Sequence, residues 1–128
     1  MNEDQLLYAA SHEWAAVEGD VCTVGITRFA VEQLTDVTYV ELPPVGRAVT
    51  KGKSFGVVES VKSANDLYAP VSGEVIAVNN KVADDPASIG ADPYGEGWMI
   101  KIRSKGAPDV SGLLSKAEYD QQTAAEGH

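Results

Sequence analysis

The fold of this chain can be predicted from residues 56–78, GVVESVKSANDLYAPVSGEVIAV. Within them, apolar segments flank the short polar segment 60–66, which contains a single basic residue, Lys62. Apolar runs on either side of a polar turn are typical of a β-hairpin, and Pro70 begins a second turn before the apolar segment 75–78. We therefore expect a β-hairpin with Lys62 at or near its tip.

A lysine in that position has two interpretations. It is either an ordinary solvated turn residue, since lysines are mostly exposed, or the target of a modifying enzyme. Such an enzyme must enclose one ammonium group, so a stiff, protruding turn suits it. An amide formed there removes the charge and leaves the added group on a long flexible stem. Glu59 and Asp66 flank the lysine, but spacing alone does not choose between the two interpretations.

The composition is that of an ordinary globular protein. Of the 128 residues, 44% are hydrophobic and 23% charged, which predicts a single domain spanning residues 1–128. The formal net charge of -9 argues against a nucleic-acid partner, because phosphate backbones require basic patches. An acidic surface instead favours basic docking sites on other proteins.

Further features bear on location and chemistry. The N-terminal segment MNEDQLLYAASHEW has neither a basic start nor a sustained apolar run, and no segment approaches the roughly twenty apolar residues of a membrane span. We expect a cytoplasmic protein that does not contact membranes. Cys22, the single cysteine, is expected to pack in the core. His12 and His128 are the only histidines, so a zinc site has no support, and His12 is expected to be a structural hydrogen-bonding residue.

Short apolar or alternating segments separated by turns predict the strands. Besides those of the central hairpin, we expect strands at residues 6–9, 14–17, 21–26, 37–42 and 98–102. In the last of them, Trp98, Ile100 and Ile102 would be buried on one side. This pattern favours a small sandwich or barrel over a parallel α/β sheet.

Helix signals are fewer. Thr27 is a suitable N-cap for a short amphipathic helix that ends near residue 35 or 36. We expect further short helices from Val82 and around Pro86, which would occupy a first helical position.

A C-terminal helix is predicted by a capping-box pattern. Ser115 is followed three residues later by Glu118, and side chains of these types satisfy each other's backbone N–H groups at a helix start. We expect residues 123–128 to be frayed.

The segment around Lys62 resembles the lipoyl-attachment region of the H-protein family of the glycine cleavage system. The resemblance is carried by ESVKS (59–63), DLYAP (66–70) and SGEV (72–75), and it continues in order in SHEW (11–14), GIT (25–27), VELP (40–43) and PYGEGW (93–98). The flanking segments separate the chain from biotin carriers and from the lipoyl domains of 2-oxoacid dehydrogenases. Asn65, Gly90 and Ala91 depart from the usual pattern of the family, which affects loop details but does not touch Lys62.

This resemblance implies a fold and a cofactor. The fold would be mainly β with short helices, a barrel-sandwich hybrid like that of lipoyl and biotinyl carriers, with a lysine-bearing hairpin and a C-terminal helix. Lys62 would carry lipoate in amide linkage, as N6-lipoyllysine. A lipoate ligase or lipoyl transferase would recognise the attachment hairpin through Glu59, Ser60, Val61, Ser63 and Asp66.

The resemblance also implies a carrier that has no catalytic residue of its own. The lipoyl group would take an aminomethyl group from glycine decarboxylase (P protein), pass it to the aminomethyltransferase (T protein) and be reoxidised by dihydrolipoyl dehydrogenase (L protein). Residues matching Ser11, Glu13 and Asp66 are associated in the family with a cleft that holds the aminomethyl arm. A carboxylate is a suitable partner for the cationic amine of that arm. The carrier is expected to be a monomer.

Other functions remain open from the sequence. Lys62 as a Schiff-base nucleophile would need a desolvated pocket in which to lose its proton, which a polar hairpin tip does not offer. An H-like protein could instead pass lipoyl groups mainly to other complexes. The chain could also be an unmodified binding domain that acts through its acidic surface.

Overall fold

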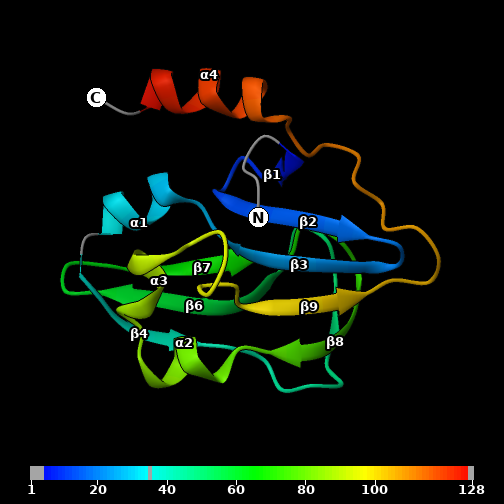
Figure 1. Cartoon of the computed structure of the whole chain (residues 1–128), viewed down its shortest axis with the longest axis horizontal. Helices are drawn as coiled ribbons and strands as arrows, with labels where there is room; N and C mark the ends of the chain where they lie inside the picture. Colours follow the sequence, from blue (N-terminus) through cyan, green and yellow to red (C-terminus); the bar gives the residue numbers. More distant parts are fainter. Residues whose placement is uncertain (1–4, 35, 127–128) are drawn as a thin grey trace.

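The computed structural model describes residues 5–34 and 36–126, and its strands form two antiparallel sheets (Figure 1). The larger sheet has the strand order β1-β2-β3-β9-β8-β5 and the smaller sheet has the order β4-β6-β7. The strands are β1 (Leu7–Tyr8), β2 (Glu13–Glu18), β3 (Val21–Ile26), β4 (Val37–Glu41), β5 (Ala48–Val49), β6 (Ser54–Ser60), β7 (Ala64–Tyr68), β8 (Gly73–Val78) and β9 (Ile100–Arg103). The helices are α1 (Arg28–Leu34), α2 (Asn80–Asp84), α3 (Ser88–Ala91) and α4 (Lys116–Glu126).

The β2–β3 hairpin forms where a glycine turn separates two apolar runs, as predicted. Gly19 in that turn has φ = 64°, in the left-handed region that glycine adopts without steric cost. Gly25 on β3 faces the indole of Trp14, and a Cβ at this position would lie 2.7 Å from the ring. The absence of a side chain at Gly25 therefore makes room for Trp14, which is completely buried.

The β6–β7 hairpin contains the segment around Lys62. Strand β6 pairs with β7 on one side and with β4 on the other. Gly56 lies where β6 and β4 approach closely, since a Cβ there would be 2.2 Å from the carbonyl oxygen of Glu41. Strand β7 is at the edge of this sheet, so its outer side faces no further strand of the sheet.

The main hydrophobic core joins the two sheets. Val24 and Ile102 of the larger sheet and Val58 and Leu67 of the smaller sheet are nearly or fully buried in it, together with the thiol of Cys22. The predicted burial of Cys22 is thus confirmed. A second cluster lies where α4 covers β1, at the top of Figure 1. Its buried members are Leu6, Tyr8, Trp14, Tyr94 and Tyr119.

Helix α1 starts as the sequence predicts. Thr27 Oγ1 accepts the N–H of Ala30 at 3.2 Å, which is the expected N-cap hydrogen bond. Val31 and Leu34 are the buried residues of the helix. Thr35, one of the two predicted end positions, lies outside the described residues.

Helix α4 also starts at its predicted cap. The N–H of Ser115 donates to Glu118 Oε1 at 2.9 Å, and the N–H of Glu118 donates to Ser115 Oγ at 3.2 Å. The helix continues through Glu126 and so includes part of the segment 123–128 that was expected to be frayed. No helix in residues 5–34 and 36–126 is long and apolar enough to cross a membrane.

The two helices between β8 and β9 were predicted in wrong positions. Helix α2 begins at Asn80 rather than at Val82. Helix α3 begins at Ser88, so Pro86 lies in the turn before it rather than at a first helical position. Proline suits turns as well as helix starts because its fixed φ is compatible with both.

The last strand is shorter than predicted. Ile100 and Ile102 are completely buried on β9, as expected. Trp98, however, lies before the strand and is only half-buried. The backbone N–H of Trp98 donates to the carbonyl oxygen of Gly95 at 3.1 Å. This bond keeps Trp98 in the turns of residues 92–98 and out of the sheet.

Candidate functional site

The β6–β7 hairpin ends in a tight turn that presents Lys62 to solvent. The N–H of Ser60 donates to the carbonyl oxygen of Ser63 at 2.8 Å and closes the turn around Val61 and Lys62. Val61 is 76% exposed, and Lys62 is also exposed. The N–H of Val61 donates to the carbonyl oxygen of Asp36 at 3.2 Å, which ties the turn to the segment before β4. The predicted place of Lys62 at the hairpin tip is confirmed.

The other hairpin residues that were expected to be recognised differ in exposure. Val61, Ser63 and Asp66 are exposed, and Glu59 is half-buried on β6. Ser60 is only 8% exposed, and its hydroxyl lies 3.2 Å from that of Ser63. Ser60 therefore acts within the turn, whereas the other four present groups to solvent.

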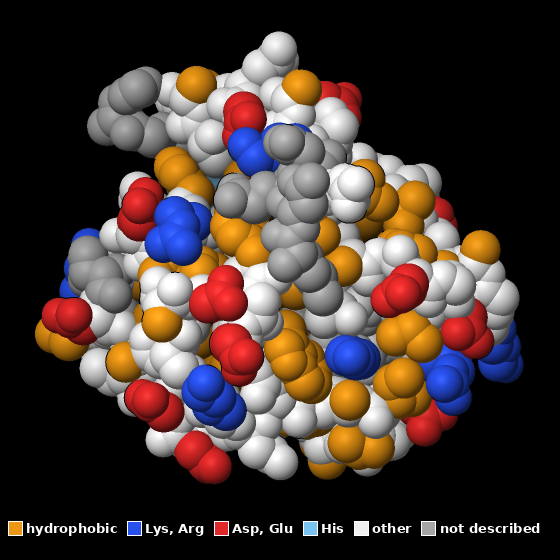
Figure 2. All heavy atoms as spheres, viewed as in Figure 1, with side chains coloured by type: hydrophobic (Ala, Val, Ile, Leu, Met, Phe, Trp, Pro, Cys, Tyr) orange, Lys and Arg blue, Asp and Glu red, His pale blue; other side chains and the backbone are white. Residues whose placement is uncertain are grey.

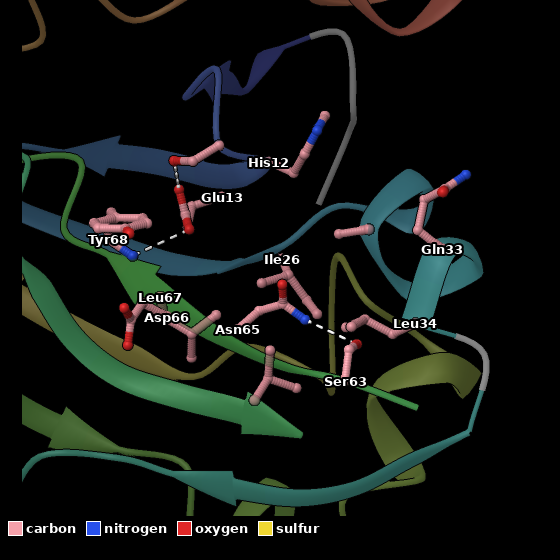
Figure 3. A pocket seen from close by; sticks show the side chains of 13 residues that line it. His12, Glu13, Ile26, Gln33, Leu34, Ser63, Asn65, Asp66, Leu67 and Tyr68 are labelled. Carbon is pink, nitrogen blue, oxygen red and sulfur yellow. Dashed lines mark hydrogen bonds between the residues drawn. The ribbon is translucent and has the colours of Figure 1, made fainter. Parts of the chain in front are cut away.

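A cleft of about 400 Å³ opens beside this turn, between β7, helix α1 and the segment that enters β2 (Figure 3). Part of its wall is apolar, formed by Ile26, Leu34 and Val58. The other described residues that line it are Ser11, His12, Glu13, Ala30, Gln33, Ser63, Asn65, Asp66, Leu67 and Tyr68. None of the described lining residues is Lys or Arg, so the fixed charges that line the cleft are acidic.

Glu13 is almost fully buried where it lines the cleft, at 1% exposure. Its Oε1 accepts the hydroxyl hydrogen of Ser11, and its Oε2 accepts the backbone N–H of Tyr68 at 3.1 Å. Figure 3 shows the carboxyl group of Glu13 directed toward the backbone of Tyr68. The hydrogen bonds offset part of the cost of burying a carboxylate, but desolvation dominates and raises the pKa of Glu13 above its ordinary value.

Asp66 lines the same cleft but is exposed. On β7 it faces the opposite side from Asn65 and Leu67, because successive side chains of a strand alternate. In Figure 3 its carboxylate points away from that of Glu13. The structure thus brings Ser11 and Glu13 into direct contact and places Asp66 at the rim.

His12 lies between Ser11 and Glu13 and points toward the C-terminal helix. Its Nδ1 is 2.7 Å from the hydroxyl oxygen of Tyr119 on α4, and its ring centroid is 4.9 Å from that of Phe29. The prediction that His12 is a structural hydrogen-bonding residue is confirmed.

Two parts of this cleft were missed from the sequence. Ile26, Leu34 and Val58 come from three separate elements, and each carries no signal beyond its hydrophobicity. The N–H of Tyr68 is a backbone group that every residue except proline has. Only the packing of β7 against the start of β2 identifies it as a donor to Glu13.

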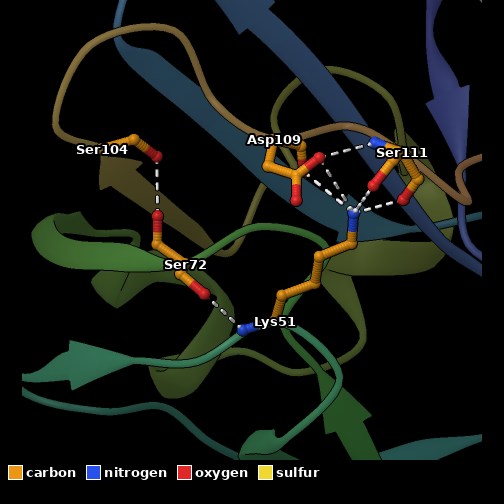
Figure 4. A network of polar contacts seen from close by, with 5 residues as sticks. All are labelled: Lys51, Ser72, Ser104, Asp109 and Ser111. Carbon is orange, nitrogen blue, oxygen red and sulfur yellow. Dashed lines mark hydrogen bonds and ion pairs between the residues drawn. The ribbon is translucent and has the colours of Figure 1, made fainter.

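A second polar network joins the turn before β6 to the connection between β9 and α4 (Figure 4). The ammonium group of Lys51 donates to the carbonyl oxygens of Asp109, at 3.0 Å, and of Ser111. In the same network Ser104 Oγ donates to the carbonyl oxygen of Ser72 at 2.6 Å. Because these contacts fix a loop, we assign Lys51 a structural role, in contrast to Lys62.

The surface offers no continuous basic area on the face shown in Figure 2. Acidic and basic side chains are interspersed there with small apolar areas. With the net charge of -9, this face gives no support to a nucleic-acid partner.

Comparisons with known proteins agree over nearly the whole chain. Residues 6–126 match the family described as Glycine cleavage H-protein. The chain is 53% identical over 116 residues to a glycine cleavage system H protein of Thermosynechococcus vestitus, covering 91% of this chain and 90% of that relative. It is 50% identical over 121 residues to one of Rubrobacter xylanophilus, covering 94% of each.

A solved structure shows the same architecture. The crystal structure of a glycine cleavage system H protein from Mycobacterium marinum matches with a TM-score of 0.84 and 40% identity, and the match covers 100% of both chains. The predicted fold, a barrel-sandwich hybrid of the lipoyl-carrier type with a C-terminal helix, is confirmed by this likeness. Since the family match and the relatives extend over both sheets, the hairpin and the cleft, the chain belongs to the glycine cleavage H-protein family.

Proposed function

We propose that the chain is the lipoyl carrier of a glycine cleavage system and that lipoate is attached to Lys62. The observation that carries this proposal is the place of Lys62 at the exposed tip of a closed turn, directly before a residue that lines the cleft. A ligating enzyme has to surround one ammonium group, and this turn already holds one out in water. Glu59, Val61, Ser63 and Asp66 would supply the groups by which that enzyme selects this lysine.

The residues present fit a lipoyl group. Ser63 follows Lys62 and lines the cleft, so a group attached to the lysine would start next to the cleft. The apolar wall that includes Leu34 and Val58 suits a hydrocarbon chain. Lipoate would supply a disulfide that opens to take up an aminomethyl group and closes again on oxidation of the dithiol.

We propose that the acidic side of the cleft binds the aminomethyl group, which is the cargo of the carrier. The amine of an aminomethyl group is cationic at neutral pH, and the carboxylate of Glu13 is held ready for it by Ser11 and Tyr68. A preorganised partner loses little entropy on binding, and a charge-assisted hydrogen bond is strong where water is excluded. Exclusion of water would also slow hydrolysis of the cargo. Asp66 would add negative charge at the rim.

The proposed partners and the proposed carrier properties follow from membership of the family. The partners would be glycine decarboxylase, the aminomethyltransferase, dihydrolipoyl dehydrogenase and a lipoate ligase or lipoyl transferase. The chain would act as a single-domain, monomeric carrier without a catalytic residue, in which Glu13 binds and shields cargo while the reactions occur on the partners. The net charge of -9 favours basic docking surfaces on those partners.

Intact mass after incubation with lipoate, ATP and a lipoate ligase tests the attachment site. We expect a single lipoyl adduct on the wild-type chain and none on Lys62→Arg, because the guanidinium group keeps the charge but cannot form this amide. Lys53→Arg is the matched control, since it changes another exposed lysine just before β6 and should be modified as fully as the wild type.

An adduct on Lys62→Arg would move the attachment site to another lysine. No adduct on the wild type, under conditions that modify a known acceptor, would refute the carrier function. An unmodified binding domain that acts through its acidic surface would then be the better description.

A further inference from the structure

The C-terminal helix is attached to the body of the protein through Tyr119. This side chain is 4% exposed, and its ring stacks on that of Tyr8 with 4.6 Å between centroids and an interplanar angle of 12°. The stacking explains how α4 stays on the larger sheet. It does not explain the position of the phenol hydroxyl, which extends beyond the stacked rings to two other elements.

The hydroxyl of Tyr119 joins both sides of the cleft. Its oxygen lies 2.7 Å from His12 Nδ1 and 2.7 Å from Thr27 Oγ1. Thr27 is the N-cap of α1, the helix that forms one wall of the cleft. His12 lies between the two residues that meet in the cleft, Ser11 and Glu13. A single hydroxyl, which can donate once and also accept, therefore fixes α1 relative to the segment 11–13.

The backbone at His12 needs such support. Its φ of 79° is in the left-handed region, which residues other than glycine adopt at some cost in energy and keep only where the surroundings hold them. The N–H of His12 donates to the carbonyl oxygen of Ala9 at 2.9 Å, and its own carbonyl oxygen accepts the N–H of Thr27 at 3.0 Å. Helix α4 adds a further tie, since Gln122 Nε2 donates to the carbonyl oxygen of Ala10 at 2.8 Å.

We propose that Tyr119 is a positioning residue for the cargo site: through His12 its hydroxyl holds the Ser11–Glu13 pair in the geometry that receives a cationic amine. The role in holding cargo rests on the proposed carrier function. The hydrogen bonds that position Ser11 and Glu13 are present in the unmodified chain. The proposal gives the C-terminal helix, which contributes none of the described residues that line the cleft, a role in shaping the cleft. The geometry of the pair can be followed through the backbone N–H of Tyr68, which donates to Glu13 at 3.1 Å from the β7 side of the cleft.

Amide hydrogen exchange of the unmodified chain tests the geometry. Tyr119→Phe keeps the stacking on Tyr8 and removes the hydroxyl. We expect the Tyr68 amide to exchange about fivefold faster or more, as the loss of one net hydrogen bond from a local opening equilibrium would give. The Val24 amide, on β3 in the larger sheet, should be unaffected.

Tyr94→Phe is the matched control. It removes a hydroxyl from the same aromatic cluster, but this hydroxyl accepts the N–H of Arg28 at the start of α1 at 3.0 Å. Tyr68 exchange should stay at the wild-type rate in this variant. Equal Tyr68 exchange in Tyr119→Phe and wild type would overturn the proposal. So would an equal acceleration at Tyr68 and Val24, which would mean that the hydroxyl only contributes to global stability.

A second variant checks the route through His12. Asparagine tolerates positive φ better than most residues, so His12→Asn removes the imidazole while retaining a side chain suited to the backbone. It should accelerate Tyr68 exchange, and adding Tyr119→Phe should give no further change. Additive effects of the two substitutions would refute the relay through His12.

The proposed protection of the cargo is tested separately, on lipoylated protein whose lipoyl group has been loaded with an aminomethyl group from glycine. The rate at which the cargo is lost to water, as formaldehyde and ammonia, should rise severalfold in Tyr119→Phe and in Glu13→Gln, with no further rise in the double variant. If Glu13→Gln leaves the rate unchanged, the proposed cargo site is wrong, while Tyr68 exchange still decides the positioning role. If Glu13→Gln raises the rate and Tyr119→Phe does not, the positioning role is wrong and the cargo site stands.

Discussion

At the scale of single residues, Glu13 is the least expected feature of the molecule. An acidic side chain at 1% exposure loses most of its hydration. Among the residues that the structure describes, the Ser11 hydroxyl and the backbone N–H of Tyr68 donate hydrogen bonds that replace part of it. A core hydrophobe would not carry that cost. We infer that the site is kept acidic for a ligand that supplies the missing positive charge.

The raised pKa of Glu13 predicts how stability depends on pH. The folded state binds the proton of this carboxyl more tightly than the unfolded state does. The contribution to stability is therefore full below the ordinary value of 4.5 and is lost as pH rises through the raised pKa. Glu13→Gln, which keeps the shape and a hydrogen-bonding side chain, should gain stability relative to wild type as pH rises from 4 to 7.

Urea unfolding at several pH values measures this difference. The free energies of unfolding of Glu13→Gln and wild type should diverge with rising pH, in favour of the variant. Parallel pH profiles would mean that the Glu13 carboxyl titrates alike in the folded and unfolded chains, and they would contradict the assigned cost of burial.

At the scale of elements, the hairpin depends on the close approach of β6 to β4. We expect Gly56→Ala to lower the free energy of unfolding by roughly 1–3 kcal/mol, the usual cost of forcing extra atoms into a packed site. The reason is that the added Cβ would lie 2.2 Å from the backbone oxygen of Glu41, which cannot rotate away as a side chain can. Denaturant unfolding measures the loss.

Gly90→Ala provides the control for that substitution. Gly90 is in α3, and a Cβ there would meet only Val31 Cγ1, at an ordinary 3.6 Å. The same chemical change should therefore be neutral, or stabilising by about 0.5–1 kcal/mol through the lower entropy of the unfolded chain. A loss at Gly90 equal to that at Gly56 would indicate a general effect of alanine rather than a specific clash.

Elements bounded by local signals could be predicted from the sequence, and the others could not. The β2–β3 turn at Gly19 and the caps at Thr27 and Ser115 are set by residues within a few positions of each other. The starts of α2 and β9 depend instead on distant partners. The side chain of Asn79, directly before α2, donates to the carbonyl oxygen of Trp98 at 2.7 Å, and no local sequence pattern predicts that contact.

The cleft could be predicted only in part, for the same reason. Lys62 was located from a local pattern of polar and apolar residues. Ser11, Glu13 and Asp66 came from the resemblance to a family, and the burial of Glu13 follows from packing that joins residues far apart in the chain. His12 could be recognised as a hydrogen-bonding residue, but its partner Tyr119 lies 107 positions away.

At the scale of the whole molecule, the two sheets share one core, so a substitution that destabilises the smaller sheet should also destabilise the larger one. Cys22 is a natural reporter. It lies on β3, which is hydrogen-bonded to β2 on one side and β9 on the other. Its thiol is completely buried, and desolvation raises its pKa to about 12. A thiol reagent needs an accessible thiolate, so Cys22 should react only when the larger sheet opens.

We therefore expect Cys22 in the native protein to be labelled far more slowly than an ordinary thiol, at a rate proportional to the small equilibrium population of the opened protein. Gly56→Ala changes only the smaller sheet, yet it should accelerate Cys22 labelling by about tenfold for each 1.4 kcal/mol lost in unfolding free energy, if both sheets open in one cooperative step. Gly90→Ala should not accelerate it. Labelling that ignores Gly56→Ala, despite a measured loss of stability, would mean that β3 opens separately. In that case the hairpin bearing Lys62 and the larger sheet would be distinct cooperative units, joined across the cleft by contacts such as the one between Glu13 and the Tyr68 N–H.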